Sequence, residues 1–136
     1  MTRSVSSPDD PEFLTVEDIL EIHALQIEKY GGGTGISDRA LLESAAAQPM
    51  STFDGEPLHR DLFEMAAAYL FHIVANHPFV DGNKRTGLVA ALVFLDLNGI
   101  HVDRGSDTLY EITMATAEGR VGKARIAKVL RRLASD

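Results

Sequence analysis

The chain has 136 residues, no cysteine and a formal net charge of −7, with 45% hydrophobic and 24% charged residues. This length suits a single domain with one core, and the missing cysteine excludes disulfide frameworks and cysteine-based zinc sites. The acidic balance argues against direct nucleic-acid binding, and an apolar run no longer than Leu88–Leu95 argues against a membrane role, so we expect a cytoplasmic protein without a signal peptide.

The N-terminal part is expected to contain a disordered tail followed by the domain. Residues 1–13 are rich in Ser, Pro and Asp, which favours disorder, and residues 14–136 are predicted to form the folded domain. Thr15 and Asp18 have the spacing of a helix-capping pair, so a first helix is predicted to begin here and to end at Gly31–Gly33.

The next two helices are separated by a loop. Ser37 is predicted to cap a second helix that continues to about Gln48, and Pro49–Pro57 is predicted to form the loop. A third helix is predicted from about Arg60 to Asn76, because its apolar residues recur at helical spacing. This apolar face is interpreted as part of the core.

Three helices are predicted for the C-terminal half. The segment Lys84–Asn98 is apolar nearly all round, which is typical of a helix that its neighbours bury. Ser106 or Asp107 is predicted to cap a fifth helix that ends near Glu118, and Lys123–Leu133 is predicted to form a sixth. No segment alternates convincingly between polar and apolar residues. The predicted fold is therefore an all-α single-domain bundle of about six helices around a buried central helix.

The segment His77–Gly87, with the sequence HPFVDGNKRTG, concentrates groups that can act on phosphates. His77 can accept a proton near neutral pH. Asp81 is an oxygen ligand suited to a magnesium ion that itself sits on nucleotide phosphates. The N–H groups and the positive dipole end of the following helix would point at the space between them, where Lys84 and Arg85 add two cations. We therefore expect this loop to bind an anion.

The loop closely resembles the signature of the Fic/Doc family, written H-x-F-x-[DE]-G-N-[GK]-R. The resemblance extends from Leu14 to about Gly99 and is to the Doc, or death-on-curing, branch. It implies a Fic/Doc-like helical domain that acts as the toxin of a toxin–antitoxin pair and transfers a phosphoryl group from ATP to a protein hydroxyl. For the Doc branch the implied target is a threonine of elongation factor Tu, so translation would be arrested, and the implied partner is an antitoxin protein.

The resemblance also implies roles for the loop residues. His77 would be the general base on the acceptor hydroxyl, and Asp81 would hold Mg²⁺ on the phosphates of ATP. The groups that would bind and stabilise the transferring phosphate follow directly: the backbone N–H of Gly82 and the side chains of Asn83, Lys84 and Arg85. Arg85 is counted with His77 and Asp81 as catalytic.

Three positions bear on the reaction type and leave it open. Lys84 is the Doc variant of a position where adenylyl-transferring Fic enzymes carry a glycine, and Leu88 stands where the longer Fic signature has a second arginine. Both disfavour adenylyl transfer. Gly82, however, is Fic-like where Doc itself has alanine. Adenylyl transfer by the same loop therefore remains the alternative within the family.

Two alternatives lie outside that chemistry. Metal-dependent hydrolysis of phosphate esters would use His72, His77 and Asp81 as ligands. It would leave Asn83 unexplained, and also Phe79, which we expect to anchor the loop in the core. A catalytically idle module that binds a partner peptide is disfavoured by the intact His77 and Asp81.

Other features are interpreted more simply. The histidines outside the loop are interpreted as surface or packing residues: His23, His59, His72 and His101. In this family a short flap aligns the target peptide, and Gly33–Ile36 and Pro49–Pro57 are both candidates. The inhibitory helix motif of Fic proteins, [ST]-x-x-x-E-x-x-[GN], has only a partial match at Thr52–Glu56. Restraint by a separate antitoxin is therefore expected.

Overall fold

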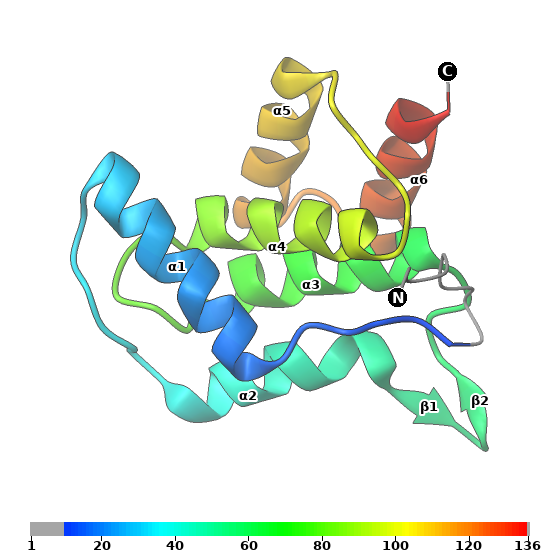
Figure 1. Cartoon of the computed structure of the whole chain (residues 1–136), viewed down its shortest axis with the longest axis horizontal. Coiled ribbons are helices and arrows are strands. Elements are labelled where there is room, and N and C mark those ends of the chain that lie inside the picture. Colours follow the sequence, from blue (N-terminus) through cyan, green and yellow to red (C-terminus); the bar gives the residue numbers. More distant parts are fainter. Residues whose placement is uncertain (1–9, 136) are drawn as a thin grey trace, which may run out of the picture.

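The computed structural model describes residues 10–135, and these are almost entirely helical (Figure 1). Within them the α-helices are α1 (Val16–Tyr30), α2 (Arg39–Ala47), α3 (Leu62–Asn76), α4 (Asn83–Leu97), α5 (Ser106–Ala117) and α6 (Lys123–Ala134). The segment predicted as a loop holds part of a short 3-10 turn (Gln48–Met50) and an antiparallel hairpin of β1 (Thr52–Phe53) and β2 (Glu56–Pro57). The predicted all-α fold is confirmed. No helix in the described part is long and apolar enough to cross a membrane.

The helices α3 and α4 lie side by side, with α5 and α6 on one side and α2 on the other (Figure 1). Gly87 lets them approach closely, because a Cβ there would lie 2.8 Å from Val74 Cγ2 and 3.2 Å from the Leu70 carbonyl oxygen. Tyr69 and Phe94 are fully buried with their rings 5.2 Å apart, and burying each such ring stabilises the fold by roughly 1.5–3 kcal/mol. The sequence places α4 alone at the centre, but α3 shares that position.

The folded domain begins earlier than the predicted boundary at residue 14. Glu12 and Asn98 exchange two hydrogen bonds, from the Glu12 N–H to Asn98 Oδ1 at 2.8 Å and from Asn98 Nδ2 to the Glu12 carbonyl oxygen at 3.0 Å. Phe13 stacks on Phe94 with ring centroids 5.8 Å apart. The end of the predicted tail 1–13 is therefore ordered, while residues 1–9 lie outside the described residues.

The start of α2 differs from the prediction by one residue. Asp38 is the N-cap, and its side chain accepts a hydrogen bond from the Leu41 N–H at 3.1 Å. The Ser37 N–H donates instead to the Pro78 carbonyl oxygen at 2.7 Å, in the loop that follows α3. The predicted Ser37 cap is therefore wrong: the N–H groups of Ser37 and Asp38 both donate to the Pro78 carbonyl oxygen, and it is the Asp38 side chain that accepts from the first turn of α2.

The helix α5 starts without a side-chain cap. Its N-cap is Gly105, whose φ is +78°. A Cβ at Gly105 would lie 2.5 Å from Leu133 Cδ2, so the Leu133 side chain of α6 would have to shift, and the positive φ itself favours glycine. The predicted cap by Ser106 or Asp107 is wrong, because both residues already lie in the first turn of the helix.

Candidate functional site

His77 ends α3 in an uncommon backbone conformation. Its φ of 56° and ψ of 53° lie in the left-handed region, and its N–H donates to the Ile73 carbonyl oxygen at 3.1 Å. Residues other than glycine seldom adopt this conformation, and Pro78 prevents the helix from continuing. The turn leaves His77 exposed at the helix end, where its imidazole can reach a group outside the protein.

Asn83 closes the loop on itself. Its Oδ1 accepts a hydrogen bond from the Phe79 N–H, and its Nδ2 donates to the Phe79 carbonyl oxygen, both at 2.9 Å. Phe79 is fully buried, as expected for an anchor, and Asn83 is 4% exposed. Hydrogen bonds in such a shielded place are strong and hold one geometry. Asn83 therefore holds the loop in shape. The sequence predicted only a role of Asn83 toward the phosphate, and not this structural one.

His23 supports the same loop from α1. Its Nε2 lies 2.8 Å from the Asp81 carbonyl oxygen, so Nε2 carries the proton and donates. Its ring stacks on Phe79 with centroids 3.8 Å apart and planes 6° apart, and His23 is only 6% exposed. The sequence interpretation as a packing residue missed the hydrogen bond. The available signal was a polar ring on an otherwise apolar helix face, because a buried polar group needs a partner.

The Asp81 carboxylate is held by backbone N–H groups on both sides. The Gly33 N–H donates to Oδ2 at 3.1 Å and the Gly82 N–H donates to Oδ1 at 3.2 Å. A Cβ at Gly32 would lie 3.0 Å from Oδ2, so a glycine there allows the backbone to come this close. Asp81 is nevertheless exposed, and each oxygen keeps a lone pair for an external ligand. The Gly82 N–H, which is predicted to bind phosphate, donates to Asp81 in this structure.

The segment Gly33–Ile36 runs along the loop as a short extended strip. Ile36 forms an isolated antiparallel bridge with Phe79, and the Val80 N–H donates to the Gly35 carbonyl oxygen at 3.1 Å. The β1–β2 hairpin lies at the opposite end of α3 (Figure 1). Of the two candidate flap segments, only Gly33–Ile36 lies beside His77 and Asp81.

A cavity of about 400 Å³ opens at the N-terminus of α4. The N-cap Gly82 has a φ of +80° and no side chain caps the helix, so the first N–H groups and the positive end of the helix dipole are available to a ligand. The loop and α4 contribute Asp81, Gly82, Asn83, Lys84, Arg85 and Leu88, and α5 contributes Ser106, Tyr110, Thr113 and Met114. This arrangement suits a ligand that carries phosphate at one end and a larger group at the other.

Comparison with known proteins shows the family of this chain. The Fic/DOC family model matches residues 13–95. The chain belongs to the Fic/Doc family. It is 36% identical over 120 residues to "Protein kinase doc" of Escherichia phage P1, and the aligned region covers 88% of this chain and 94% of that protein. It is 37% identical over 107 residues to "Toxin Doc" of Mycolicibacterium smegmatis, covering 74% of this chain and 80% of that protein.

The two cations of the Fic/Doc loop occupy different surroundings. Lys84 and Arg85 are both exposed and both line the cavity. The Arg85 guanidinium also lies over the Tyr30 ring, with its Cζ 4.2 Å from the ring centroid. A cation–π contact at an exposed site contributes roughly 0.5–1 kcal/mol, which is enough to favour one side-chain position. Tyr30 at the end of α1 therefore helps to position Arg85.

The predicted ligand set for ester hydrolysis is not assembled in this Fic/Doc domain. His72 lies beside Lys123, with 3.2 Å between His72 Nε2 and Lys123 Nζ. Among residues 10–135, no group of three His, Cys, Asp or Glu side chains could hold a metal ion. The alternative with His72, His77 and Asp81 as ligands is therefore wrong. His101, interpreted as a surface residue, is exposed and pairs with Asp96.

Proposed function

We propose that this protein is the toxin of a toxin–antitoxin pair, and that it acts in the cytoplasm by transferring the γ-phosphoryl group of ATP to a hydroxyl of a protein target such as elongation factor Tu. Two relatives that cover most of the chain bear the names "Protein kinase doc" and "Toxin Doc". The observation that carries the proposal is the uncapped N-terminus of α4, which opens into a cavity beside Asp81 and Lys84. Modification of that target would arrest translation.

Each loop residue would contribute one part of the transfer. His77, exposed at the end of α3, would take the proton from the acceptor hydroxyl or orient that hydroxyl. Lys84, Arg85, the Asn83 side chain and the N–H groups of the first turn of α4 would stabilise the charge on the transferring group. The hydrogen bonds between Asn83 and Phe79 would keep these groups in place before the nucleotide binds.

Asp81 fits the magnesium role as a single carboxylate. Mg²⁺ keeps several waters and is usually bound by one or two carboxylates together with substrate phosphates. Asp81 is exposed, and its two oxygens are steadied by the N–H groups of Gly33 and Gly82. The ion would neutralise charge on the phosphates of ATP.

The segment Gly33–Ile36 would align the target. Its exposed residues lie beside the loop, and its backbone already pairs there with Phe79 and Val80. An extended peptide that pairs with the outer edge of such a strip would present its hydroxyl close to His77.

Gly82 gives little support to the alternative of adenylyl transfer. Its φ of +80° lies where glycine is favoured, and a Cβ there would lie 3.2 Å from Ile27 Cδ1 and 3.5 Å from His23 Cδ2. The turn and the packing of α1 therefore account for this glycine without reference to the nucleotide. Lys84 and Leu88 continue to favour phosphoryl transfer.

A separate antitoxin would restrain the enzyme. The partial match to the inhibitory helix motif of Fic proteins, Thr52–Glu56, falls in the β1–β2 hairpin and not in a helix. That hairpin lies at the end of α3 that is remote from His77 (Figure 1). Restraint by this segment in cis is therefore unsupported, and a partner protein is the simpler inhibitor.

The proposal is tested with ATP labelled separately at the α- and γ-phosphates. The purified protein is incubated with purified elongation factor Tu and, in parallel, with cell lysate. We expect label from the γ-position only, on a threonine identified by mass spectrometry. Label from the α-position would replace phosphoryl with adenylyl transfer, and label on another protein alone would change the target but not the reaction. If neither label is transferred, the proposed activity is wrong.

A further inference from the structure

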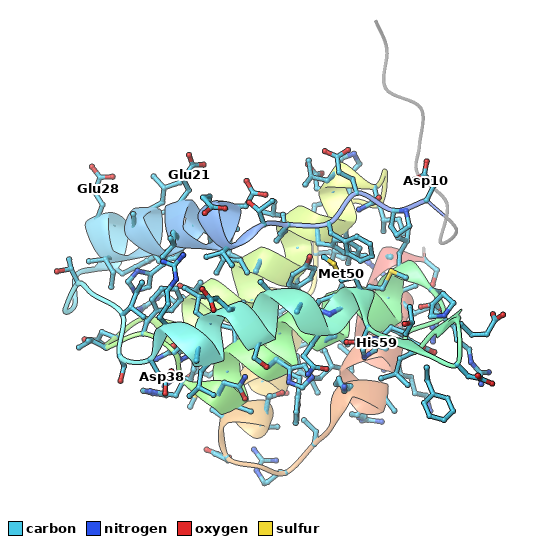
Figure 2. All side chains as sticks on the ribbon, turned by 90° about the horizontal axis from the view of Figure 1, so that it is seen from below. Asp10, Glu21, Glu28, Asp38, Met50 and His59 are labelled. Atoms are coloured by element: carbon cyan, nitrogen blue, oxygen red, sulfur yellow. The ribbon has the colours of Figure 1, made fainter. Side chains whose placement is uncertain are left out.

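Three basic side chains from distant parts of the sequence meet where α3 packs against α6. Lys123 Nζ lies 3.2 Å from His59 Nε2 and 3.2 Å from His72 Nε2. His59 precedes α3 and is 5% exposed, whereas His72 and Lys123 are partly exposed. Figure 2 labels His59 close to the ribbon of α6. This group, called here the His–His–Lys cluster, is separate from the cavity at α4 and has no part in the proposed function.

The hydrogen bonds of the cluster fix where its protons lie. The lysine nitrogen has at least two N–H groups in either its charged or its neutral form, so it can donate to both Nε2 atoms, and both imidazoles are then neutral with their proton on Nδ1. Burial lowers the pKa of Lys123. Burial and the Lys123 charge together lower the pKa of His72 to about 4, and the same two causes lower the pKa of His59, against a smaller opposing effect of Glu64.

Lys123 lacks the counter-ion that usually holds a lysine in its charged form. Within residues 10–135 no carboxylate lies within ion-pairing distance of its Nζ. Two acids at this end of α3 have other partners: Asp61 pairs with Arg131 at 2.7 Å, and Glu64 Oε1 accepts from the Arg60 N–H at 2.7 Å. The polar partners of the amine are therefore two neutral bases, and Nζ also lies 6.0 Å from the centroid of the Phe71 ring. Neither imidazole supplies the negative charge that would hold the amine in its charged form, and the fraction of Lys123 that is neutral carries a nucleophilic lone pair.

The amine is also accessible. A groove of about 390 Å³ runs along this face of α6 and is lined by His59, Glu64, Lys123, Ala124, Ala127 and Arg131. The two alanines leave room above the helix, so a small reagent can approach Nζ. Lys128, on the same helix, is exposed and has no such neighbours.

We propose that Lys123 is a modification site that reacts with small acyl phosphates. The neutral amine would attack the acyl carbon, the bond from that carbon to the phosphate oxygen would break, and inorganic phosphate would leave. The surplus proton on nitrogen would pass to His59 Nε2 or His72 Nε2 and then to water. The product is an amide, which carries no charge and has one N–H, so it can no longer donate to both imidazoles.

The chain supplies its own controls, because its only lysines are Lys29, Lys84, Lys123 and Lys128. The full-length protein is incubated with acetyl phosphate, and acetylation of each lysine is followed by mass spectrometry. We expect Lys123 to react faster than Lys128, because burial lowers the pKa of Lys123 and so raises the fraction of its amine that is neutral. Equal rates at Lys123 and Lys128 would overturn the proposal.

Two further measurements separate a reactive amine from one that is merely exposed. The rate at Lys123 should reach its plateau at a lower pH than the rate at Lys128, and coincident pH profiles would count against the proposal. His72→Gln keeps a polar side chain but removes one base, so it should lower the Lys123 rate relative to Lys128, whereas Lys128→Arg should leave the Lys123 rate unchanged. An unchanged rate in a folded His72→Gln protein, judged by circular dichroism, would also refute the role of the cluster.

Discussion

The loop after α3 and the His–His–Lys cluster both bring basic groups together near α3. The basic groups of the loop are exposed to water, whereas those of the cluster are partly or fully buried. Lys84 and Arg85 are exposed beside an uncapped helix end, which adds to their positive potential. His72 and Lys123 are partly buried, and burial lowers the pKa of each. An exposed basic group stays charged and can bind anions. A buried one is more often neutral, and in that form it can accept a proton or act as a nucleophile.

The largest expected effect comes from a substitution in the loop. His77→Ala should reduce phosphoryl transfer by roughly 10²- to 10⁴-fold, the usual contribution of a general base. The fold should remain intact, because the side chain is exposed. Transfer of γ-label and growth arrest are measured at equal protein levels, with His101→Ala, another exposed histidine, as the control. Growth arrest by His77→Ala at the wild-type level would remove His77 from the mechanism.

Asp81→Asn tests whether the carboxylate charge matters. The amide keeps the shape of the side chain but loses the charge that pairs with Mg²⁺, so magnesium-dependent ATP affinity should fall by roughly tenfold, equivalent to about 1.4 kcal/mol. Isothermal titration calorimetry with and without Mg²⁺ measures this change. Wild-type affinity in the variant would make Asp81 a turn residue only.

His23 gives a smaller and more specific effect. His23→Leu removes the hydrogen bond to the Asp81 carbonyl oxygen, worth about 1 kcal/mol, and should slow phosphoryl transfer about fivefold. His23→Gln can place an N–H near the same oxygen and should recover most of the rate. If both variants slow phosphoryl transfer equally, the packing of the His23 ring on Phe79 accounts for the effect, and the hydrogen bond does not.

The cluster predicts how stability depends on pH. The pKa of His72 is lowered from 6.5 to about 4 in the folded protein, so the unfolded chain binds more protons between these values. The stabilising contribution is complete above pH 6.5 and is lost as the pH falls toward 4. It is on the order of 1 kcal/mol, because a partly exposed ring is screened by water. Melting temperatures of the wild type should therefore fall more steeply over this range than those of His72→Gln, and parallel curves would contradict the shift.

The smallest expected effect concerns Lys84 and distinguishes phosphoryl transfer from adenylyl transfer. If the side chain blocks the cradle, Lys84→Gly should allow a minor adenylyl product, limited because Leu88 leaves the longer signature incomplete. Lys84→Ala is the control, since it removes the charge without the freedom of glycine. Mass spectrometry of the modified target distinguishes the two adducts. An adenylyl adduct from the unmutated protein would show that Lys84 does not select the phosphoryl group.

Local patterns in the sequence predicted the helices and the loop, but not the contacts that join distant segments. Thr15 with Asp18 and the apolar spacing of α3 depend on neighbours in the chain, and these predictions are confirmed. The cap of α2 is Asp38, and the N–H groups of Ser37 and Asp38 both donate to the Pro78 carbonyl oxygen across the fold. Such pairings follow from the tertiary arrangement, which no local spacing encodes.

In the candidate site, too, the sequence predicted the local residues but not the contacts from distant segments. The signature named the loop residues, yet it could not show that His23 on α1 holds the loop from behind. The His–His–Lys cluster was equally hidden, because His59, His72 and Lys123 lie far apart in the sequence and each alone is compatible with a surface residue. The roles of His77, Asp81 and Lys84 in chemistry remain predictions.

The brevity of the connection between α3 and α4 bears on the order in which the molecule assembles. Residues 77–82 alone join these helices, so their contacts close at low entropic cost and can form early in folding. The contacts of His23 and Gly33 with Asp81 require α1 to dock from far along the chain, and would form later. A local opening of α1 would therefore remove the contacts of His23 and Gly33 with Asp81 while the α3–α4 pair stays folded.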